Sequence, residues 1–469
     1  MALVFVQQPL YTTLAAEQDI IYTINEDSTV VIDNEKVKYV AKVSVMSNYT
    51  SPVEIGVFKT TPNAAQVGIF DLGTILKNYV SPDYTGMNDT NAVSEFKGVD
   101  YSDTNYHSIH TVDRFCLGHS STQWFQIDFT MEYLGADATK PNAVAEDSSL
   151  LVSTGFNFLF NGVVDELDPL VLTGNDFGFN LGIDYACSAA TQGALSDVPT
   201  IQYARLTDYG TMGYLTNFIG FGTPTLSMTK VTIKLYNASD SLLATFDSDV
   251  STANGGYVGV TPISETFLIY AACYPANFTG AGFSDWNTHK ANCSYYTIQP
   301  YSTSTAMGKE YRVNIICDDA RGFEGIRLTW LNKHGTWDYY TFNKKSIRSI
   351  TTNRKTYTQL TGTWNESTFK LQGSRGGRKN YKVDSKEKIK MNTDYVSESE
   401  AVWFEQLINS PEVYILNGYQ SDTGGILRRY VQPVTLTTSN YTRKTIANDK
   451  LIQYTFEVER TKNLRTQSV

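Results

Sequence analysis

Three histidines and a cysteine lie close together in the sequence and could form a metal site. His107, His110, Cys116 and His119 fall within 13 residues, and imidazole and thiolate groups are common zinc ligands. Their spacing does not match a standard structural zinc site, and a polar loop leading into a strand explains the same residues. The sequence therefore leaves open whether these four residues bind a metal, and it predicts no other cofactor.

The patterns of a hydrolase or of a nucleotide-binding enzyme are incomplete. Gly118-His119-Ser120 and Gly282-Phe283-Ser284 lack the last glycine of a serine nucleophile elbow, and neither opens a helical pattern, which predicts two turns. Neighbouring acids, as in Asp318-Asp319 and Asp165-Glu166, point to opposite faces of a strand and cannot flank one sugar. The sequence has no glycine-rich phosphate-binding loop. We therefore expect no catalytic residues and no enzyme activity.

A basic stretch in the last third of the chain is its strongest electrostatic feature. Between Thr341 and Lys390 there are 13 Lys or Arg and 3 Asp or Glu, whereas the whole chain has a net charge of −10. The remaining residues therefore carry about −20, and we expect the stretch to contact a neighbouring copy of the chain. A path for DNA phosphates ranks second, and a solvated basic face is the third explanation. The candidate interface residues are Lys344, Lys345, Arg348, Arg375, Arg378 and Lys379.

The composition excludes several protein classes. A length of 469 residues corresponds to roughly two to four domains. Charged residues make up 18%, below the roughly 25% typical of soluble domains, and Thr, Ser, Asn, Gly and 31 Tyr take their place. This mixture favours strands and turns over long solvated helices. It argues against a coiled coil, a helical solenoid, a disordered chain and collagen.

The cysteines and the apolar segments indicate where the protein is made. The five cysteines are odd in number and irregularly spaced, which fits a reducing cytoplasm better than a disulfide framework. The most apolar run, Phe267 to Tyr274, is far shorter than the roughly 20 residues of a membrane helix. The first residues lack a basic region and a cleavage site, so we expect neither a secretory signal nor a membrane span.

Alternation of apolar and polar residues predicts a mainly β fold, with several β-sandwich or barrel-like domains and few short helices. Between residues 155 and 310, turn signals recur about every ten residues, as in a sandwich. The clearest strand patterns cover residues 37–45, 125–133, 231–236 and 312–317. The predicted domains are an N-terminal β domain (1–140), a middle β-rich domain (141–310) and a C-terminal β region (311–469).

Local signals also predict two helices and a hairpin. Asp71 can cap one short helix over residues 71–80 in the N-terminal domain. Ser397-Glu398-Ser399-Glu400 is a capping box, which predicts a helix over 398–409. Four turn-forming residues, Asn332-Lys333-His334-Gly335, separate two strand patterns and predict a β-hairpin. In the basic stretch 341–390, residues 373–378 contain too much glycine for a regular element.

Aromatic residues gather in and near this hairpin. They are Trp330, Trp337, Tyr339, Tyr340 and Trp364. Such side chains can stack on sugars, but on a hairpin they more often pack in a core or an interface. We therefore expect packing rather than sugar binding.

The hairpin and the second helix resemble segments of a known group of proteins. Residues 326–342, IRLTWLNKHGTWDYYTF, resemble a hairpin common in structural proteins of podovirus-like tailed bacteriophages, including crAss-like phages. Residues 403–415, WFEQLINSPEVYI, are similar to a helix-plus-strand unit of the same group, as is Pro62-Asn63 together with residues 68–72. These are structural patterns and carry no catalytic signature. The middle section, 140–310, takes no part in the resemblance.

The resemblance implies a non-enzymatic component of the virion, in the tail, the tail hub or a connector ring. Such a subunit would be assembled in the host bacterial cytoplasm, form a ring-like homo-oligomer and contact other virion proteins. DNA that passes through the particle could contact the basic stretch. The first alternative is a virion protein that binds a receptor or carbohydrate, such as a head fibre or tail spike. The second is a β-rich glycoside hydrolase.

Overall fold

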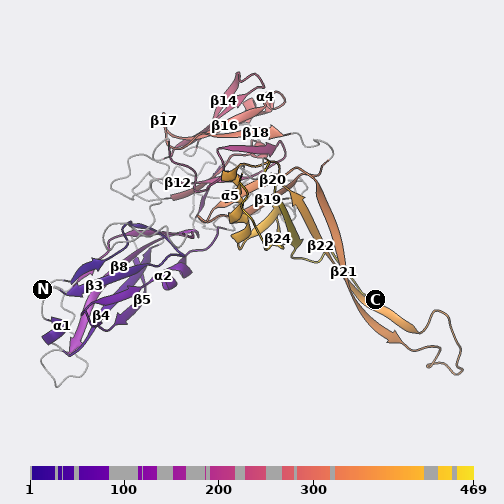
Figure 1. The fold of residues 1–469 in the computed structure, drawn as a ribbon, viewed down its shortest axis with the longest axis horizontal. Coiled ribbons are helices and arrows are strands. Elements are labelled where there is room, and N and C mark those ends of the chain that lie inside the picture. The colour runs from indigo at the N-terminus through magenta and orange to yellow at the C-terminus, as the bar shows by residue number, and fades with distance from the viewer. Residues whose placement is uncertain are drawn as a thin grey trace. The chain divides into compact units, whose positions relative to one another are not determined.

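The fold consists mainly of β-strands. The structure is a computed structural model that describes residues 3–26, 30–33, 35–46, 52–83, 115–118, 120–134, 151–164, 185, 191–216, 228–249, 267–278, 283–316, 323–416, 431–445 and 451–468. Several sheets and only a few short helices make up this part of the chain, which confirms the predicted fold class (Figure 1). No helix within these residues has the length and apolar character needed to cross a bilayer.

The chain divides into two compact units. Unit 1 comprises Met1–Ile315 and Leu331–Asp338, and unit 2 comprises Ile316–Trp330 and Tyr339–Val469. The end of one hairpin therefore groups with unit 1, although the strands that lead into it belong mainly to unit 2. The predicted boundary between residues 140 and 141 lies outside the described residues and stays a prediction.

Two sheets near the N-terminus form a β-sandwich in unit 1. One has the strand order β1-β3-β6, and the other has the order β2-β10-β8-β4-β5 with β9 beside β8. The strands of the first are β1 (Leu3–Gln7), β3 (Ile21–Glu26) and β6 (Gly68–Asp71). Those of the second are β2 (Thr13–Ala15), β4 (Glu35–Met46), β5 (Pro52–Thr60), β8 (Thr122–Leu134), β9 (Val152–Ser153) and β10 (Asn157–Phe160). The predicted strands 37–45 and 125–133 are β4 and β8, which pair antiparallel with Val43 opposite Ile127.

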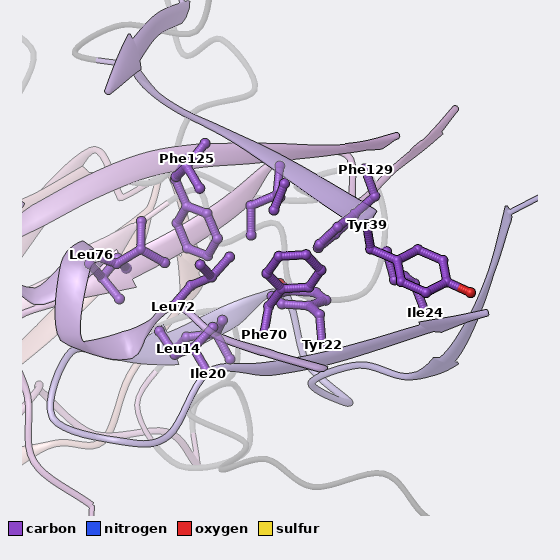
Figure 2. Close-up of a cluster of buried hydrophobic side chains, with 14 of the residues drawn as sticks. Leu14, Ile20, Tyr22, Ile24, Tyr39, Phe70, Leu72, Leu76, Phe125 and Phe129 are labelled. Atoms are coloured by element: carbon purple, nitrogen blue, oxygen red, sulfur yellow. The ribbon is translucent and has the colours of Figure 1, made fainter. Parts of the chain in front are cut away.

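Side chains from both sheets fill the core of this sandwich (Figure 2). Tyr22 of β3 and Phe70 of β6 each place a ring 5.5 Å from the ring of Phe129 on β8. Tyr39 and Val43 of β4 are fully buried beneath them, at alternate positions of the predicted pattern. Burial of one such large apolar side chain contributes roughly 1.5–3 kcal/mol, so this shared core holds the two sheets together.

The helices of the sandwich are very short. The segment predicted as a helix over 71–80 is α2 (Gly73–Leu76) followed by the 3₁₀ helix η1 (Lys77–Tyr79). The Asp71 side chain accepts a hydrogen bond from the Gly73 N–H at 3.1 Å, although Leu72 is the N-cap residue. The structure adds a second helix, α1 (Val30–Asp33), where we expected only one. A helix of four residues is too short to produce a periodic sequence signal.

Two further sheets belong to unit 1, with the orders β11-β18-β16-β13-β14 (β17 beside β16) and β12-β15-β7. The first contains β11 (Ile201–Arg205), β13 (Lys230–Tyr236), β14 (Leu242–Asp249), β16 (Tyr295–Ser302), β17 (Thr305–Ala306) and β18 (Tyr311–Ile316). The second contains β7 (Phe115–Gly118), β12 (Thr211–Thr216) and β15 (Phe267–Ala272). The predicted strands 231–236 and 312–317 correspond to β13 and β18.

One predicted turn in this region is wrong. Ser284 opens the helix α4 (Ser284–His289), which follows the 3₁₀ helix η6 (Pro275–Asn277). Trp286 of α4 is buried, with its ring 5.2 Å from that of Phe278 and 6.0 Å from that of Tyr296. Packing of this one aromatic side chain stabilises a helix that is too short to have an apolar stripe of its own.

Unit 2 is built on one eight-stranded sheet of order β20-β19-β23-β24-β25-β22-β21, with β26 beside β22. Its strands are β19 (Ile326–Leu331), β20 (Trp337–Phe342), β21 (Ser346–Gln359), β22 (Gly377–Asn392), β23 (Val413–Leu416), β24 (Val431–Leu436), β25 (Thr455–Arg460) and β26 (Arg465–Ser468). β21 and β22 form a long antiparallel hairpin that extends beyond the other strands of the unit (Figure 1). The irregular segment predicted at 373–378 is shorter than expected, because Gly377 and Arg378 already belong to β22.

The predicted helix over 398–409 is confirmed as α5 (Glu398–Asn409). Its capping box is present: the Ser397 hydroxyl accepts from the Glu400 N–H at 3.2 Å, and the Glu400 carboxylate accepts from the Ser397 N–H at 2.7 Å. Trp403 on its buried face places its ring 4.9 Å from that of Trp330 on β19. The helix therefore covers the sheet of unit 2 through aromatic packing.

The predicted hairpin between β19 and β20 is also confirmed. In its turn the Asn332 side-chain oxygen accepts hydrogen bonds from the His334 and Thr336 N–H groups, each at 3.0 Å. Gly335 has φ +81°, a left-handed conformation that costs glycine little. An Asn followed by a Gly three residues later is thus what this turn requires.

Candidate functional site

The six candidate interface residues lie on the β21–β22 hairpin in two groups. Lys344, Lys345 and Arg348 lie at the beginning of β21, and Arg375, Arg378 and Lys379 lie where the connecting loop enters β22. Arg348 is opposite Ile389 and Thr358 is opposite Arg378, so ten residues of strand separate the groups. At the usual rise of a strand this is about 33 Å. The structure therefore does not bring the six residues into one patch.

Two of the three cations at the beginning of the hairpin, Lys344 and Arg348, form ion pairs within the chain. Lys344 Nζ lies 2.8 Å from Asp394 Oδ2. Arg348 donates from Nε to Glu324 and from Nη1 to Glu387, both at 3.0 Å. The hydrogen bond with Glu324, supported by that with Glu387, raises the pKa of Arg348 further above its ordinary value in spite of partial burial. Lys344 and Arg348 therefore have little positive charge left for a partner, whereas Lys345 forms no ion pair with a described residue.

Acidic residues of β25 neutralise the middle of the hairpin. Lys386 Nζ on β22 lies 2.7 Å from Glu459 Oε1, and Lys388 Nζ lies 3.6 Å from Glu457 Oε1. The hydrogen bond from Lys386 lowers the pKa of Glu459. The two partners of each ion pair are about 70 positions apart in the sequence. Only the pairing of β22 with β25 shows that their charges cancel.

The outer part of the hairpin keeps its charge. Residues 354–381, hereafter the distal segment, contain six Lys or Arg and one acid, Glu366. The basic residues are Arg354, Lys355, Lys370, Arg375, Arg378 and Lys379, and none forms an ion pair with another described residue. Arg378 and Lys379 donate only to neutral oxygens, the Thr356 hydroxyl at 3.0 Å and the Ser374 carbonyl at 2.8 Å. The distal segment thus carries a formal charge of +5, and no ion pair within the described chain offsets it.

The two units carry charges of opposite sign. Unit 1 contains 33 Asp or Glu and 15 Lys or Arg, a formal charge of −18. Unit 2 contains 15 acidic and 23 basic residues, a formal charge of +8, and the two values make up the −10 of the chain. The uneven distribution seen in the sequence therefore follows the division into units, with the hairpin on the basic one.

The distal segment also exposes large apolar side chains, which sequence reasoning missed except for Trp364. Leu360, Trp364, Phe369 and Leu371 are each at least 57% exposed. The sequence contains four large apolar residues within 12 positions of a loop otherwise made of Thr, Gly, Asn, Glu, Ser and Lys. The sequence could not show that these side chains are exposed, because a buried loop and an exposed loop can have the same sequence pattern.

The aromatic residues of the β19–β20 hairpin are packed, as we expected. Trp330, Trp337 and Tyr339 are buried, and Tyr340 is half-buried with its ring 4.9 Å from that of Phe404. They contribute to cores rather than to a sugar-binding surface. Trp364, which lies on the other hairpin, is the exposed member of the predicted group.

The proposed metal site cannot be built from the structure. His107, His110 and His119 lie outside the described residues, and so does the side chain of Cys116, whose backbone belongs to β7. The site therefore stays a prediction. Among the described residues, no group of three or more His, Cys, Asp or Glu side chains is arranged to hold a metal ion.

The two serine motifs lie in different surroundings. Ser121, beside the first serine motif, is buried and donates to Asp83, whose carboxylate also accepts from the Tyr270 hydroxyl at 3.0 Å. This is a buried hydrogen-bonded crosslink between distant segments. Ser284 of the second motif is exposed at the beginning of α4. The acidic pairs Asp318-Asp319 and Asp165-Glu166 lie outside the described residues.

A buried histidine lies in the turn between β19 and β20. His334 Nε2 is 3.5 Å from Asp197 Oδ1, and Lys333 Nζ is 2.9 Å from Asp197 Oδ2. Burial lowers the pKa of His334, and the nearby Asp197 carboxylate offsets only part of this effect. Burial alone would raise the pKa of Asp197, but its bonds with His334 and Tyr185 and the charge of Lys333 lower it well below its usual range. None of His334, Asp197 and Lys333 is exposed, and their contacts stabilise the turn.

We expect unit 1 to lose stability through His334 as the pH falls. The folded state favours the neutral imidazole, whereas the unfolded chain binds a proton near pH 6.5, so the free energy of unfolding decreases below that pH. The slope is at most about 1.4 kcal/mol per pH unit. Urea unfolding at pH 7.5 and 5.5 should show a larger loss for the natural chain than for His334→Gln. Parallel changes in the two proteins would contradict this role of His334.

Comparison with known proteins adds no relative. No protein-family model matches the chain, and no curated protein matches it significantly.

Proposed function

We propose that the chain is a non-enzymatic structural subunit of a tailed phage particle, part of the tail, the tail hub or a connector ring. It assembles through interfaces with copies of itself and with other virion proteins. The proposal takes the phage context from the resemblance of residues 326–342 and 403–415, and the mode of action from the surface of the β21–β22 hairpin.

The observation that carries the proposal is the positive charge of the distal segment, which forms no ion pair with another described residue. A free protein gains solubility from charges of both signs spread over its surface, whereas here +5 is concentrated on one extended hairpin of a chain whose other unit carries −18. Opposite charges on two surfaces steer copies together in one orientation. Because the acidic and basic surfaces differ, the contact is head-to-tail, and it forms a ring when the rotation from one copy to the next closes on itself.

The exposed edge strand of the sheet of unit 2 also supports the proposal that the chain assembles with other chains. β21 is the last strand in the order of its sheet, and most of its side chains are exposed. Its outer edge has no strand partner within the described residues. A strand edge of this length invites pairing with another chain, which a monomer normally avoids and an assembling subunit uses.

A receptor- or carbohydrate-binding virion protein is the alternative, because an exposed Trp364 on a projecting loop could stack on a sugar. A glycan array separates the two functions. Strong binding that is lost in Trp364→Ala, together with a monomeric protein, would favour the alternative. Activity on a bacterial polysaccharide that depends on one acidic residue would instead favour a glycoside hydrolase.

Removing positive charge from the distal segment tests the proposal. We expect the triple variant Arg375→Gln, Arg378→Gln and Lys379→Gln to weaken self-association by about tenfold or more, because three steering and pairing charges are lost. Sedimentation velocity measures the association, and negative-stain images show whether the assemblies are rings. The circular dichroism spectrum should not change, since none of the three forms an ion pair in the described chain.

The matched control is the triple variant Lys444→Gln, Lys462→Gln and Arg465→Gln. It removes the same charge from the same unit but outside the distal segment, and should assemble like the natural chain. Assemblies of normal size from the Arg375, Arg378 and Lys379 variant, at both low and high salt, would show that these residues are not in an interface.

A further inference from the structure

The loop at the end of the β21–β22 hairpin presents a cluster of apolar side chains to solvent. We define the tip cluster as Leu360, Trp364, Phe369 and Leu371. Leu371 is 77% exposed and Trp364 is 68% exposed, so most of each side chain faces solvent. The cluster is therefore a separate feature from the charges considered above.

The loop is held in shape by its own hydrogen bonds. The buried Thr363 donates its hydroxyl to the Thr368 carbonyl at 2.9 Å and accepts from the Lys370 N–H at 2.8 Å. The Trp364 indole donates to the Thr361 carbonyl at 2.9 Å. These bonds fix the backbone on both sides of the loop, so the apolar side chains project from an ordered support.

Contact between two members of the tip cluster limits their movement. The rings of Trp364 and Phe369 meet edge to face with centroids 5.5 Å apart. An aromatic anchor that is already ordered loses little conformational entropy on binding. Such rigid aromatic groups dominate the binding energy of interfaces, whereas the polar residues around them contribute less.

The surroundings of the cluster restrict its partner. Lys370 and Arg375 of the same loop are exposed and form no ion pair within the described residues. A surface that receives this loop must combine an apolar depression with acidic groups at its rim. The hairpin of another copy cannot supply it, because two distal segments of charge +5 repel each other.

We infer that the tip cluster anchors one copy of the chain to unit 1 of a second copy. Unit 1 has the required sign of charge, −18, and its edge strands expose apolar side chains: Val4 and Val6 on β1, Val53 and Val57 on β5, and Ile201 and Tyr203 on β11. The inference rests on the proposed function and deepens it, since it names the partner surface and the side chains that bind.

A double substitution in the tip cluster tests the anchor. We expect Trp364→Ser with Leu371→Ser to raise the dissociation constant of self-association by tenfold or more, with unchanged circular dichroism and unchanged urea unfolding. The control, Tyr395→Ser with Leu451→Ser, removes an aromatic and a leucine of similar exposure elsewhere in unit 2 and should leave association unchanged. Sedimentation velocity of the full chain measures both variants.

A crosslinking experiment identifies the partner. A photoreactive benzoyl-phenylalanine replaces Phe369, and nitrogen-15-labelled and unlabelled chains are mixed before irradiation. We expect crosslinked peptides that join position 369 of one copy to residues 1–315 of the other isotope. Crosslinks between copies that enter only unit 2 would overturn the inference.

The outcomes separate the anchor from the proposed function. If the natural chain forms rings and the tip variant forms them equally well, the tip cluster is not the anchor and the structural role stands. If the natural chain remains a monomer at all concentrations, both are wrong. If the tip variant loses binding to a single-stranded oligonucleotide while its self-association is unchanged, the partner is nucleic acid and the inference fails.

Discussion

Replacing Gly335 by alanine should lower the free energy of unfolding of unit 1 by about 3 kcal/mol or more. Gly335 has φ +81°, where an L side chain is strained. An added methyl group would also overlap the backbone carbonyl of Asn161, a rigid neighbour that cannot rotate away. The turn would have to move, and with it the Lys333 carbonyl that accepts from the Val163 N–H at 2.6 Å.

Gly155→Ala is the matched control for this substitution. Gly155 also lies in unit 1 and has φ +69°, but a methyl group there would meet open space. The free energy of unfolding of this variant should fall by only about 1 kcal/mol, the conformational cost of a side chain at positive φ. Urea unfolding followed by tryptophan fluorescence compares the two variants. Equal losses would mean that the contact with Asn161 does not constrain the turn.

Truncation of Trp330 to alanine should cost about 3–5 kcal/mol and is the largest effect that we expect in unit 2. Trp330 is fully buried on β19, and its ring lies 4.9 Å from that of Trp403 and 6.3 Å from that of Phe404. The cavity left behind would remove the surface on which α5 packs. Helix α5 should therefore become accessible to proteases in the variant, which limited proteolysis can show.

The control is Trp364→Ala, which removes the same side chain from the exposed loop. Its effect on the free energy of unfolding should stay within about 0.5 kcal/mol, because no core contact is lost. The two substitutions thus separate stability from association: Trp330→Ala should unfold the chain more easily, and Trp364→Ala should weaken only its association. A loss below about 1 kcal/mol for Trp330→Ala would contradict its place in the core.

Several elements could be predicted because their signals are local. The capping box at Ser397 fixes the first residue of α5, and its side chain and backbone groups are three residues apart. The turn at Asn332–Gly335 follows from residues that bond to their own backbone. The strands β4 and β8 follow from alternation over nine or more residues, which one buried sheet face imposes.

Other elements could not be predicted because distant residues decide them. Helix α4 exists because Trp286 packs on Phe278 and Tyr296, and its own six residues carry no helical pattern. The carboxylates that neutralise Lys386 and Arg348 come from β25 and from the residues before β19. No spacing rule along the chain could have paired them.

By itself, the sequence determined that this protein is a mainly β chain with a basic stretch against an acidic remainder, and where α5 and the β19–β20 turn begin and end. These properties depend on composition and on neighbours a few residues apart. Only the tertiary structure decided which of the basic residues keep their charge, and that the tip cluster is exposed. Both depend on which strands become neighbours, because β25 pairs with the inner part of β22 only, and the distal segment has no ion pair to another described residue.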